Sequence, residues 1–130
     1  MVVADASAII QACLSDADLG HLGAHDLVAP PLLWSEATSA IHELKWRGEI
    51  SAELASKAVE RLSRAPVRAR RPAELHAEAW RVADRLGWAK TYDAEYVALA
   101  RLLGCRLVTL DARLRRGADR LGFVIGPGDL

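Results

Sequence analysis

Four carboxylates occupy positions from which a chain of alternating strands and helices could bring them together. Asp5 directly follows the apolar run Val2-Val3-Ala4, and Asp111 directly follows the run 107–110. If these runs are neighbouring parallel strands, both carboxylates project from the same edge of the sheet, where open α/β sheets bind their ligands. Asp93 lies at the start of the helix expected before the second run, and Glu36 lies in an otherwise apolar helical segment.

Convergence of these four side chains would favour a divalent cation between them. Carboxylates held close together raise one another's pKa values, and a bound cation relieves that repulsion. Hard oxygen ligands suit Mg²⁺ or Mn²⁺. Residues 1–44 contain no Lys or Arg, so Asp5 and Glu36 have no local ion-pair partner. The pattern therefore indicates a site for a divalent cation.

Each carboxylate also has a purely structural interpretation. Asp5 and Asp111 stand where a helix N-cap is expected, and Asp is a favoured capping residue. Asp93 near a helix N-terminus could interact with the helix dipole. Glu36 could lie on a solvated stripe with Glu43, seven residues further on. The two interpretations differ in whether the four groups converge.

The elements that would position these groups are legible as alternating short β-branched runs and helical patterns. Strands are expected at 2–4, 27–29, around 67, at 106–110 and at 123–125, and helices at 6–14, 30–47, 51–65, 73–87, 91–103 and 112–121. Such alternation predicts a doubly wound (α/β/α) parallel sheet of four to five strands. The length of 130 residues fits a single domain, expected to span 1–130.

Charge is balanced overall but unevenly distributed. Lys plus Arg and Asp plus Glu both number 17, which argues against a surface that is basic throughout. The acids of residues 1–44 have no basic neighbours along the chain: Asp5, Asp16, Asp18, Asp26, Glu36 and Glu43. Arginines gather at 61–71 and 113–120, and Lys90 lies just before the Asp93 helix. These clusters are either solvated faces or contacts to phosphate groups, and the first could instead meet an acidic partner segment.

Other residue types point to no separate chemistry. Cys13 and Cys105 lie in apolar runs and are expected to be buried free thiols in a reducing compartment. No Cys/His spacing suggests zinc, no apolar run approaches a membrane span, and the N-terminus lacks the basic region of a signal peptide, so a cytoplasmic location is expected. The histidines are expected to be surface or packing residues without partners, and the tryptophans core or interface residues.

The motifs taken together resemble a known family. They are Val2-Val-Ala-Asp5-Ala-Ser7, the helical Glu36, Thr91-Tyr-Asp93-Ala-Glu-Tyr96-Val-Ala-Leu-Ala100 and Leu107-Val-Thr109-Leu-Asp111. Their order and spacing are similar to the PIN-domain family, and more narrowly to the VapC-type ribonuclease toxins of bacterial type II toxin–antitoxin systems. The resemblance covers essentially the whole chain.

This resemblance implies a homodimer, an acidic pocket that holds one or two Mg²⁺ or Mn²⁺ ions, endonucleolytic cleavage of RNA such as tRNA or rRNA, and a cognate VapB-type antitoxin. By position, Asp5, Glu36, Asp93 and Asp111 match the acidic quartet, with Asp5 and Asp93 as central ligands. Ser7 and Thr109 match the hydroxyl residues of the pocket. Some relatives carry a further acid after the last Asp, where this chain has Ala112 and Arg113, so the number of ions stays open. Substrate contacts are expected from Lys90, Arg113, Arg68 and Arg70.

Two other functions are compatible with the same sequence. One is a PIN-type nuclease of RNA processing without a toxin role, and a neighbouring gene for a small DNA-binding antitoxin would argue against it. The other is a non-catalytic α/β binding module in which the acids are only helix caps. That module would gain no thermal stability from Mn²⁺, whereas a cation that binds only the native state must stabilise it. The helices 30–47 and 51–65 are the expected partner surface.

Overall fold

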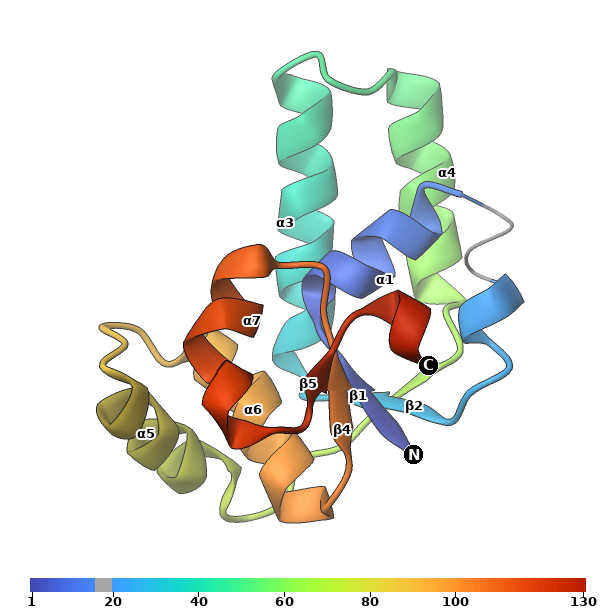
Figure 1. The fold of residues 1–130 in the computed structure, drawn as a ribbon. Helices are drawn as coiled ribbons and strands as arrows, with labels where there is room; N and C mark the ends of the chain where they lie inside the picture. The colour runs from blue at the N-terminus through green and yellow to red at the C-terminus, as the bar shows by residue number, and fades with distance from the viewer. Residues whose placement is uncertain (16–19) are drawn as a thin grey trace.

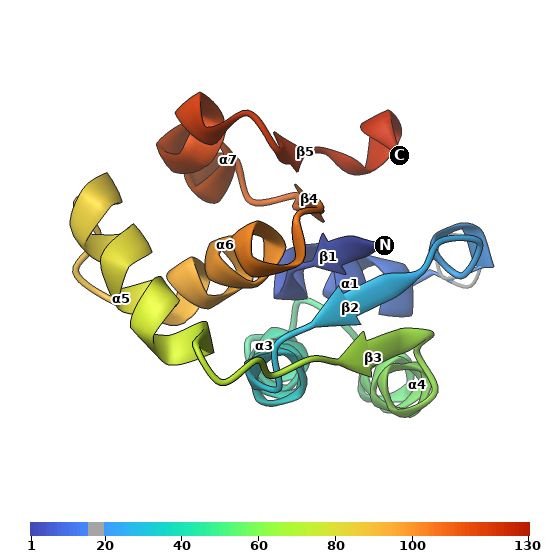
Figure 2. The ribbon, with the colours of Figure 1, turned by 90° about the horizontal axis from the view of Figure 1, so that it is seen from below.

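The computed structural model describes residues 1–15 and 20–130, so Asp16 and Asp18 lie outside the described residues. The described chain forms one five-stranded sheet: β1 (Val2–Ala4), β2 (Leu27–Ala29), β3 (Val67–Ala69), β4 (Arg106–Val108) and β5 (Val124–Ile125). The strands pair in the order β3-β2-β1-β4-β5, and every pair is parallel (Figure 2). The predicted doubly wound parallel sheet is confirmed.

The helices of the described chain follow the strands as the alternation predicted. They are α1 (Ala6–Cys13), α3 (Leu32–Trp46), α4 (Ala52–Ser63), α5 (Leu75–Leu86), α6 (Tyr92–Leu103) and α7 (Ala112–Ala118). Because parallel crossovers are right-handed, the helices after β1 and β2 cover one face of the sheet and those after β3 and β4 cover the other. The α3–α4 hairpin extends well beyond the sheet (Figure 1).

Several element boundaries differ from the prediction. The helix expected from residue 30 begins at Leu32, and the one expected from residue 73 begins at Leu75. The last expected helix ends at Ala118 and continues as a 3₁₀ turn, Asp119–Leu121, which Gly122 ends with a φ of +82°. The final strand begins at Val124, one residue late. Such short, weakly periodic ends are the least certain part of any sequence-based assignment.

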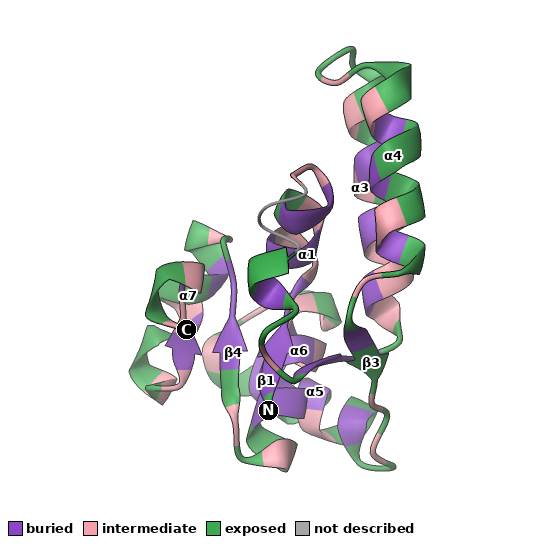
Figure 3. Cartoon of the chain, turned by 90° about the vertical axis from the view of Figure 1, so that its right-hand side faces the viewer, coloured by how far each residue is buried: buried purple, intermediate pink, exposed green. Residues whose placement is uncertain are grey.

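The core lies between the sheet and the inner faces of the helices. Val3, Val28 and Leu107 are fully buried, and α6 contributes six buried residues, more than its neighbours, because it packs against both β1 and β4. Figure 3 shows the buried central strands and the alternation of buried and exposed positions along α3 and α4. Of the core or interface positions expected for the tryptophans, a core position does not hold for Trp46 and Trp80, which are 80% and 68% exposed.

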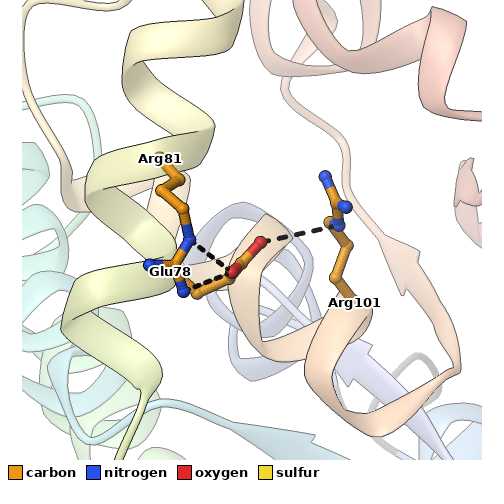
Figure 4. Close-up of polar contacts among 3 residues, drawn as sticks. All are labelled: Glu78, Arg81 and Arg101. Carbon is orange, nitrogen blue, oxygen red and sulfur yellow. Dashed lines mark hydrogen bonds and ion pairs between the residues drawn. The ribbon is translucent and has the colours of Figure 1, made fainter.

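A charged contact helps to hold α5 against α6. Glu78 on α5 accepts hydrogen bonds from Nε and Nη2 of Arg81, at 3.0 and 2.8 Å, and its other carboxylate oxygen lies 3.6 Å from Nε of Arg101 on α6 (Figure 4). The arginines are largely exposed, so each pair contributes modestly to stability. The contact nevertheless connects α5 to the helix whose first turn carries Asp93.

The sequence also makes predictions for the two cysteines and for membrane-spanning segments. Cys13 is buried and Cys105 is half-buried, and both are free, as expected of unpaired thiols. Burial raises the pKa of the Cys13 thiol to about 11. Across residues 1–15 and 20–130, no helix is long and apolar enough to span a membrane.

Candidate active site

After β4, two backbone amides donate hydrogen bonds to side-chain hydroxyl groups instead of to a neighbouring strand. The strand expected over 106–110 ends at Val108, so Asp111 lies three residues beyond it rather than directly after it. The Leu110 amide donates to Ser7 Oγ at 2.9 Å, and the Asp111 amide donates to Thr109 Oγ1 at 2.9 Å. These two bonds take up amides that a longer strand would have given to its neighbour.

Asp5 is both a helix cap and the most buried acid of the site. Its side chain is 4% exposed, and its Oδ1 accepts from Ser7 Oγ at 2.7 Å and from the Ala8 amide at 3.1 Å. Its Oδ2 accepts a hydrogen bond from Thr109 Oγ1. Burial raises the pKa of Asp5, the three donors oppose that rise, and the charge of Asp111 adds to it. The capping interpretation is therefore correct for Asp5, but the Asp5 carboxylate also accepts hydrogen bonds from the hydroxyl groups of Ser7 and Thr109.

Asp111 and Asp93 lie at the starts of α7 and α6. Asp111 caps α7 through one oxygen, Oδ1, which accepts from the amides of Arg113 at 2.9 Å and Leu114 at 3.3 Å. Asp93 is half-buried in the first turn of α6. Burial raises the pKa of Asp93, the Asp111 charge raises it further, and Arg113 lowers it. Each carboxylate thus lies within electrostatic range of the other.

Glu36 reaches the same region from α3, held by a residue to which the motif analysis gave no role. The hydroxyl of Tyr96 donates to Glu36 Oε1 at 2.5 Å, and Tyr96 itself is 1% exposed. Burial raises the pKa of Glu36, and the charges of Asp93, Asp5 and Glu95 raise it as well. Tyr96 could have been found from its spacing, because a residue three positions after Asp93 lies on the same face of the helix.

The four carboxylates influence one another electrostatically, and Arg113 is a cationic neighbour of Asp93. The pKa values of Asp5, Glu36 and Asp93 are each raised partly by another member of the quartet. None of the ion pairs found among the described residues involves any of the four. Within that part of the chain, no three acidic, imidazole or thiol side chains are grouped tightly enough to enclose a metal ion. The hard-oxygen donor set itself fits Mg²⁺ or Mn²⁺.

A pocket of about 490 Å³ opens beside these acids. Its lining includes the acids Glu36 and Asp93, the bases Lys90 and Arg113, and the aromatic residues Trp88 and Tyr92. Carboxylates and cations in one hollow match a phosphodiester with an associated metal ion, because the cations can contact phosphate oxygens. Two of the four bases expected to contact the substrate are therefore at the pocket.

The structure does not bring Arg68 and Arg70 to this pocket. Arg68 Nη2 pairs with Asp26 at 2.8 Å, and Arg70 Nη1 lies 3.9 Å from the sulfur of Met1. Asp26 precedes β2 and Met1 precedes β1, so both side chains reach toward the amino ends of the strands, opposite the edge that carries Asp5. The prediction that Arg68 and Arg70 contact the substrate is therefore not supported at this pocket. Arg68 belongs to β3, which lies at the edge of the sheet, and Arg70 directly follows that strand.

The histidines stay outside the pocket, as expected, but one of them has a partner. His76 Nε2 lies 3.6 Å from Glu95 Oε1, which corrects the expectation that no histidine is paired. Among the described residues that line the pocket there is no histidine. The titratable groups that line it are therefore Glu36, Asp93, Lys90, Arg113 and the Tyr92 hydroxyl.

The buried hydroxyl of Thr109 gives a stability test of this arrangement. Replacing Thr109 with Val keeps the shape but removes the donor to Asp5 and the acceptor for the Asp111 amide. We expect a loss of about 1–3 kcal/mol in the free energy of unfolding, because a buried carboxylate and an amide lose partners. The loss should shrink at low pH, where Asp5 is protonated. Thermal melts beside Thr38→Val, at an exposed position of α3, provide the control, and equal losses would contradict the assignment.

Fold and site together define a small doubly wound α/β protein with an acidic pocket at the carboxyl edge of its sheet. The sequence profile of the PIN domain matches residues 2–120. The chain is 36% identical over 115 residues to "VapC ribonuclease Mb0985" of Mycobacterium bovis and to "Ribonuclease VapC9" of Mycobacterium tuberculosis, covering 88% of this chain and 88% of each relative. It is 32% identical to "Ribonuclease VapC3" of M. tuberculosis, over 88% and 85% of the two chains.

A solved structure agrees with these relatives. The crystal structure of PAE2754 from Pyrobaculum aerophilum superposes with a TM-score of 0.75 at 25% identity, covering 98% of this chain and 84% of that one. The chain belongs to the PIN-domain family, and its curated relatives are VapC ribonucleases. The family resemblance predicted from the motifs is confirmed.

Proposed function

We propose that this protein is a Mg²⁺- or Mn²⁺-dependent endoribonuclease and the toxin of a VapBC-type toxin–antitoxin pair. The observation that carries the proposal is the pocket that Glu36 and Asp93 line together with Lys90 and Arg113, near enough to Asp5 and Asp111 for their charges to raise the pKa values of Glu36 and Asp93. Relatives named as VapC ribonucleases support the reaction class. The substrate is RNA, with tRNA and rRNA as the first candidates.

Each residue of the site has a proposed role. Asp5 and Asp93 would be the central metal ligands, and Glu36 and Asp111 would bind directly or through water. Ser7 and Thr109 hold the Asp5 carboxylate in place through their hydroxyl groups. When bound, the metal supplies Lewis acidity toward the phosphate and the attacking water. Lys90 and Arg113 would contact the phosphates that flank the cleaved bond, which gives affinity without base specificity.

The proposal extends to the partners and to the extent of the domain. We infer that residues 1–130 form one nuclease domain that dimerises and is inhibited by a VapB-type antitoxin in the cytoplasm. The α3–α4 hairpin supports a partner surface, because it projects from the sheet and exposes Trp46 and Val59 to 80% and 43%. Apolar side chains of this size are enriched in the buried centres of protein interfaces.

Thermal stability and cleavage test metal binding and activity separately. With Mn²⁺ at about 100 times its dissociation constant, the native state should gain about 2.7 kcal/mol, seen as a rise in melting temperature. A pool of tRNA and rRNA should yield discrete fragments with Mg²⁺ or Mn²⁺ and none with EDTA. If neither Mg²⁺ nor Mn²⁺ changes the melting temperature and no RNA is cleaved, the proposal is contradicted and the binding module is favoured.

A further inference from the structure

Two hollows meet at the same two side chains. Glu36 and Tyr92 line the 490 Å³ pocket of the active site, and they also line a second hollow of about 390 Å³ beside it. The second hollow runs along α3, where its remaining lining residues are Leu32, Ser35, Ser39, Ala40 and Glu43. The two hollows therefore adjoin at Glu36 and Tyr92.

The two hollows differ in chemistry. The first carries the cations Lys90 and Arg113, which suit a phosphate. The described lining of the second contains no Lys or Arg and combines apolar carbon with hydroxyl groups and the two carboxylates of Glu36 and Glu43. A phosphate would be repelled there, whereas a flat group with a hydrogen-bonding edge would be accommodated. Its volume lies within the range of roughly 300–1,000 Å³ that is usual for sites of small ligands.

Tyr92 is the aromatic side chain that joins the two hollows. It is 56% exposed, whereas Tyr96, one turn further along α6, is 1% exposed and used by the core and by Glu36. Packing therefore does not account for an aromatic residue at position 92. Proteins that bind single-stranded RNA use such exposed rings to stack unpaired bases next to a cationic path for the backbone.

We propose that Tyr92 stacks one unpaired RNA base next to the cleaved phosphate and that the hollow along α3 holds this base. The inference rests on the proposed ribonuclease function and adds a residue that selects unpaired over paired RNA. The phosphate of that nucleotide lies in the first hollow, near Lys90 and Arg113. The base lies against the Tyr92 ring, with its edge toward the hydroxyl groups of Ser35 and Ser39.

Binding of RNA with and without bases tests the stack directly. The probe is fluorescein-labelled single-stranded RNA of mixed sequence, about 12 nucleotides long, which lies within the usual site size for such proteins. A second probe carries abasic riboses in place of the bases. Binding is measured by anisotropy in EDTA, so that cleavage does not interfere. The proteins are wild type, Tyr92→Phe, Tyr92→Leu and the control Trp80→Leu, which removes an exposed aromatic residue that lines neither hollow.

We expect Tyr92→Leu to weaken binding of the normal RNA about 10-fold, because one base–aromatic stack is lost. Tyr92→Phe should stay within about twofold of wild type, since the ring remains. On abasic RNA, wild type and Tyr92→Leu should bind equally, because neither can stack. Equal binding of normal RNA by Tyr92→Leu and Trp80→Leu would overturn the inference, and so would a Tyr92→Leu defect that persists on abasic RNA.

A cleavage assay with Mn²⁺ distinguishes a failure of the Tyr92 inference from a failure of the proposed ribonuclease function. If wild type cleaves RNA and Tyr92→Leu cleaves it with the same KM, only the Tyr92 assignment fails. If wild type neither binds nor cleaves RNA, the ribonuclease function itself fails. A Tyr92→Leu protein that binds RNA normally but dissociates into monomers in sedimentation experiments would assign Tyr92 to a protein interface and overturn its contact with RNA.

Discussion

Replacing Asp93 with Asn should reduce the rate of RNA cleavage by about 10²-fold or more. Changes to groups that only support metal ligands already cost about 10- to 100-fold, and Asp93 is proposed as a ligand itself. The amide keeps the size of the side chain but removes the charge that a cation requires. Growth inhibition on expression should be lost in parallel. The measurement is single-turnover cleavage of a defined tRNA fragment, with Asp84→Asn as a control on an exposed acid of α5.

The melting temperature of the same variant distinguishes a metal ligand from a helix-dipole contact. Burial and the charge of Asp111 raise the pKa of Asp93, so the ionised carboxylate destabilises the metal-free fold at neutral pH. We therefore expect metal-free Asp93→Asn to melt at or above the wild-type temperature. The difference should vanish as the pH falls through the raised pKa, because the wild-type group is then protonated. A lower melting temperature at neutral pH would instead support the dipole interpretation.

The order of the elements was readable because each strand is a short apolar run closed by a polar residue. Two examples are Val2–Ala4, which is followed by Asp5, and Leu27–Ala29, which is followed by two prolines. Both segments form the predicted strands. The end of β4 was not readable from the same pattern. Leu110 continues the apolar run, but its amide donates a hydrogen bond to Ser7 Oγ, 103 positions earlier in the chain. A contact between residues so far apart cannot be predicted from the local sequence pattern.

The hydroxyl residues Ser7 and Thr109 could be singled out from the sequence, and both bond to Asp5, but the support that Tyr96 gives Glu36 could not. Residues at the carboxyl ends of β1 and β4 had to meet once the strands were parallel neighbours, and register pairs Ala4 with Val108. The contact between Tyr96 and Glu36 depends instead on how α6 crosses α3, which follows from packing across the domain. The directions of Arg68 and Arg70 likewise depend on the place of β3 at the sheet edge. Residue type alone could not separate those two from Arg113.

Asp111 illustrates why a structural interpretation and a functional one need not exclude each other. Its Oδ1 caps α7, and both hydrogen bonds described for its side chain use that oxygen. Its charge nevertheless raises the pKa values of Asp5 and Asp93, so the carboxylate lies within electrostatic range of both. One side chain can therefore end a strand-to-helix turn with one oxygen and offer the other to a cation.

Two substitutions at Asp111 separate these roles. Asp111→Asn keeps an oxygen that can cap α7, so the melting temperature should stay close to that of wild type, while cleavage falls about 10- to 100-fold with the lost charge. Asp111→Ala removes both roles, so it should lose similar activity and also about 1 kcal/mol of stability. Ser51→Ala is the matched control, because Ser51 caps α4 through the Leu54 amide at 3.0 Å, away from the site. It should lose the stability and keep the activity. An Asp111→Asn protein with full activity would leave capping as the whole role of this residue, and the acidic site would then consist of Asp5, Glu36 and Asp93.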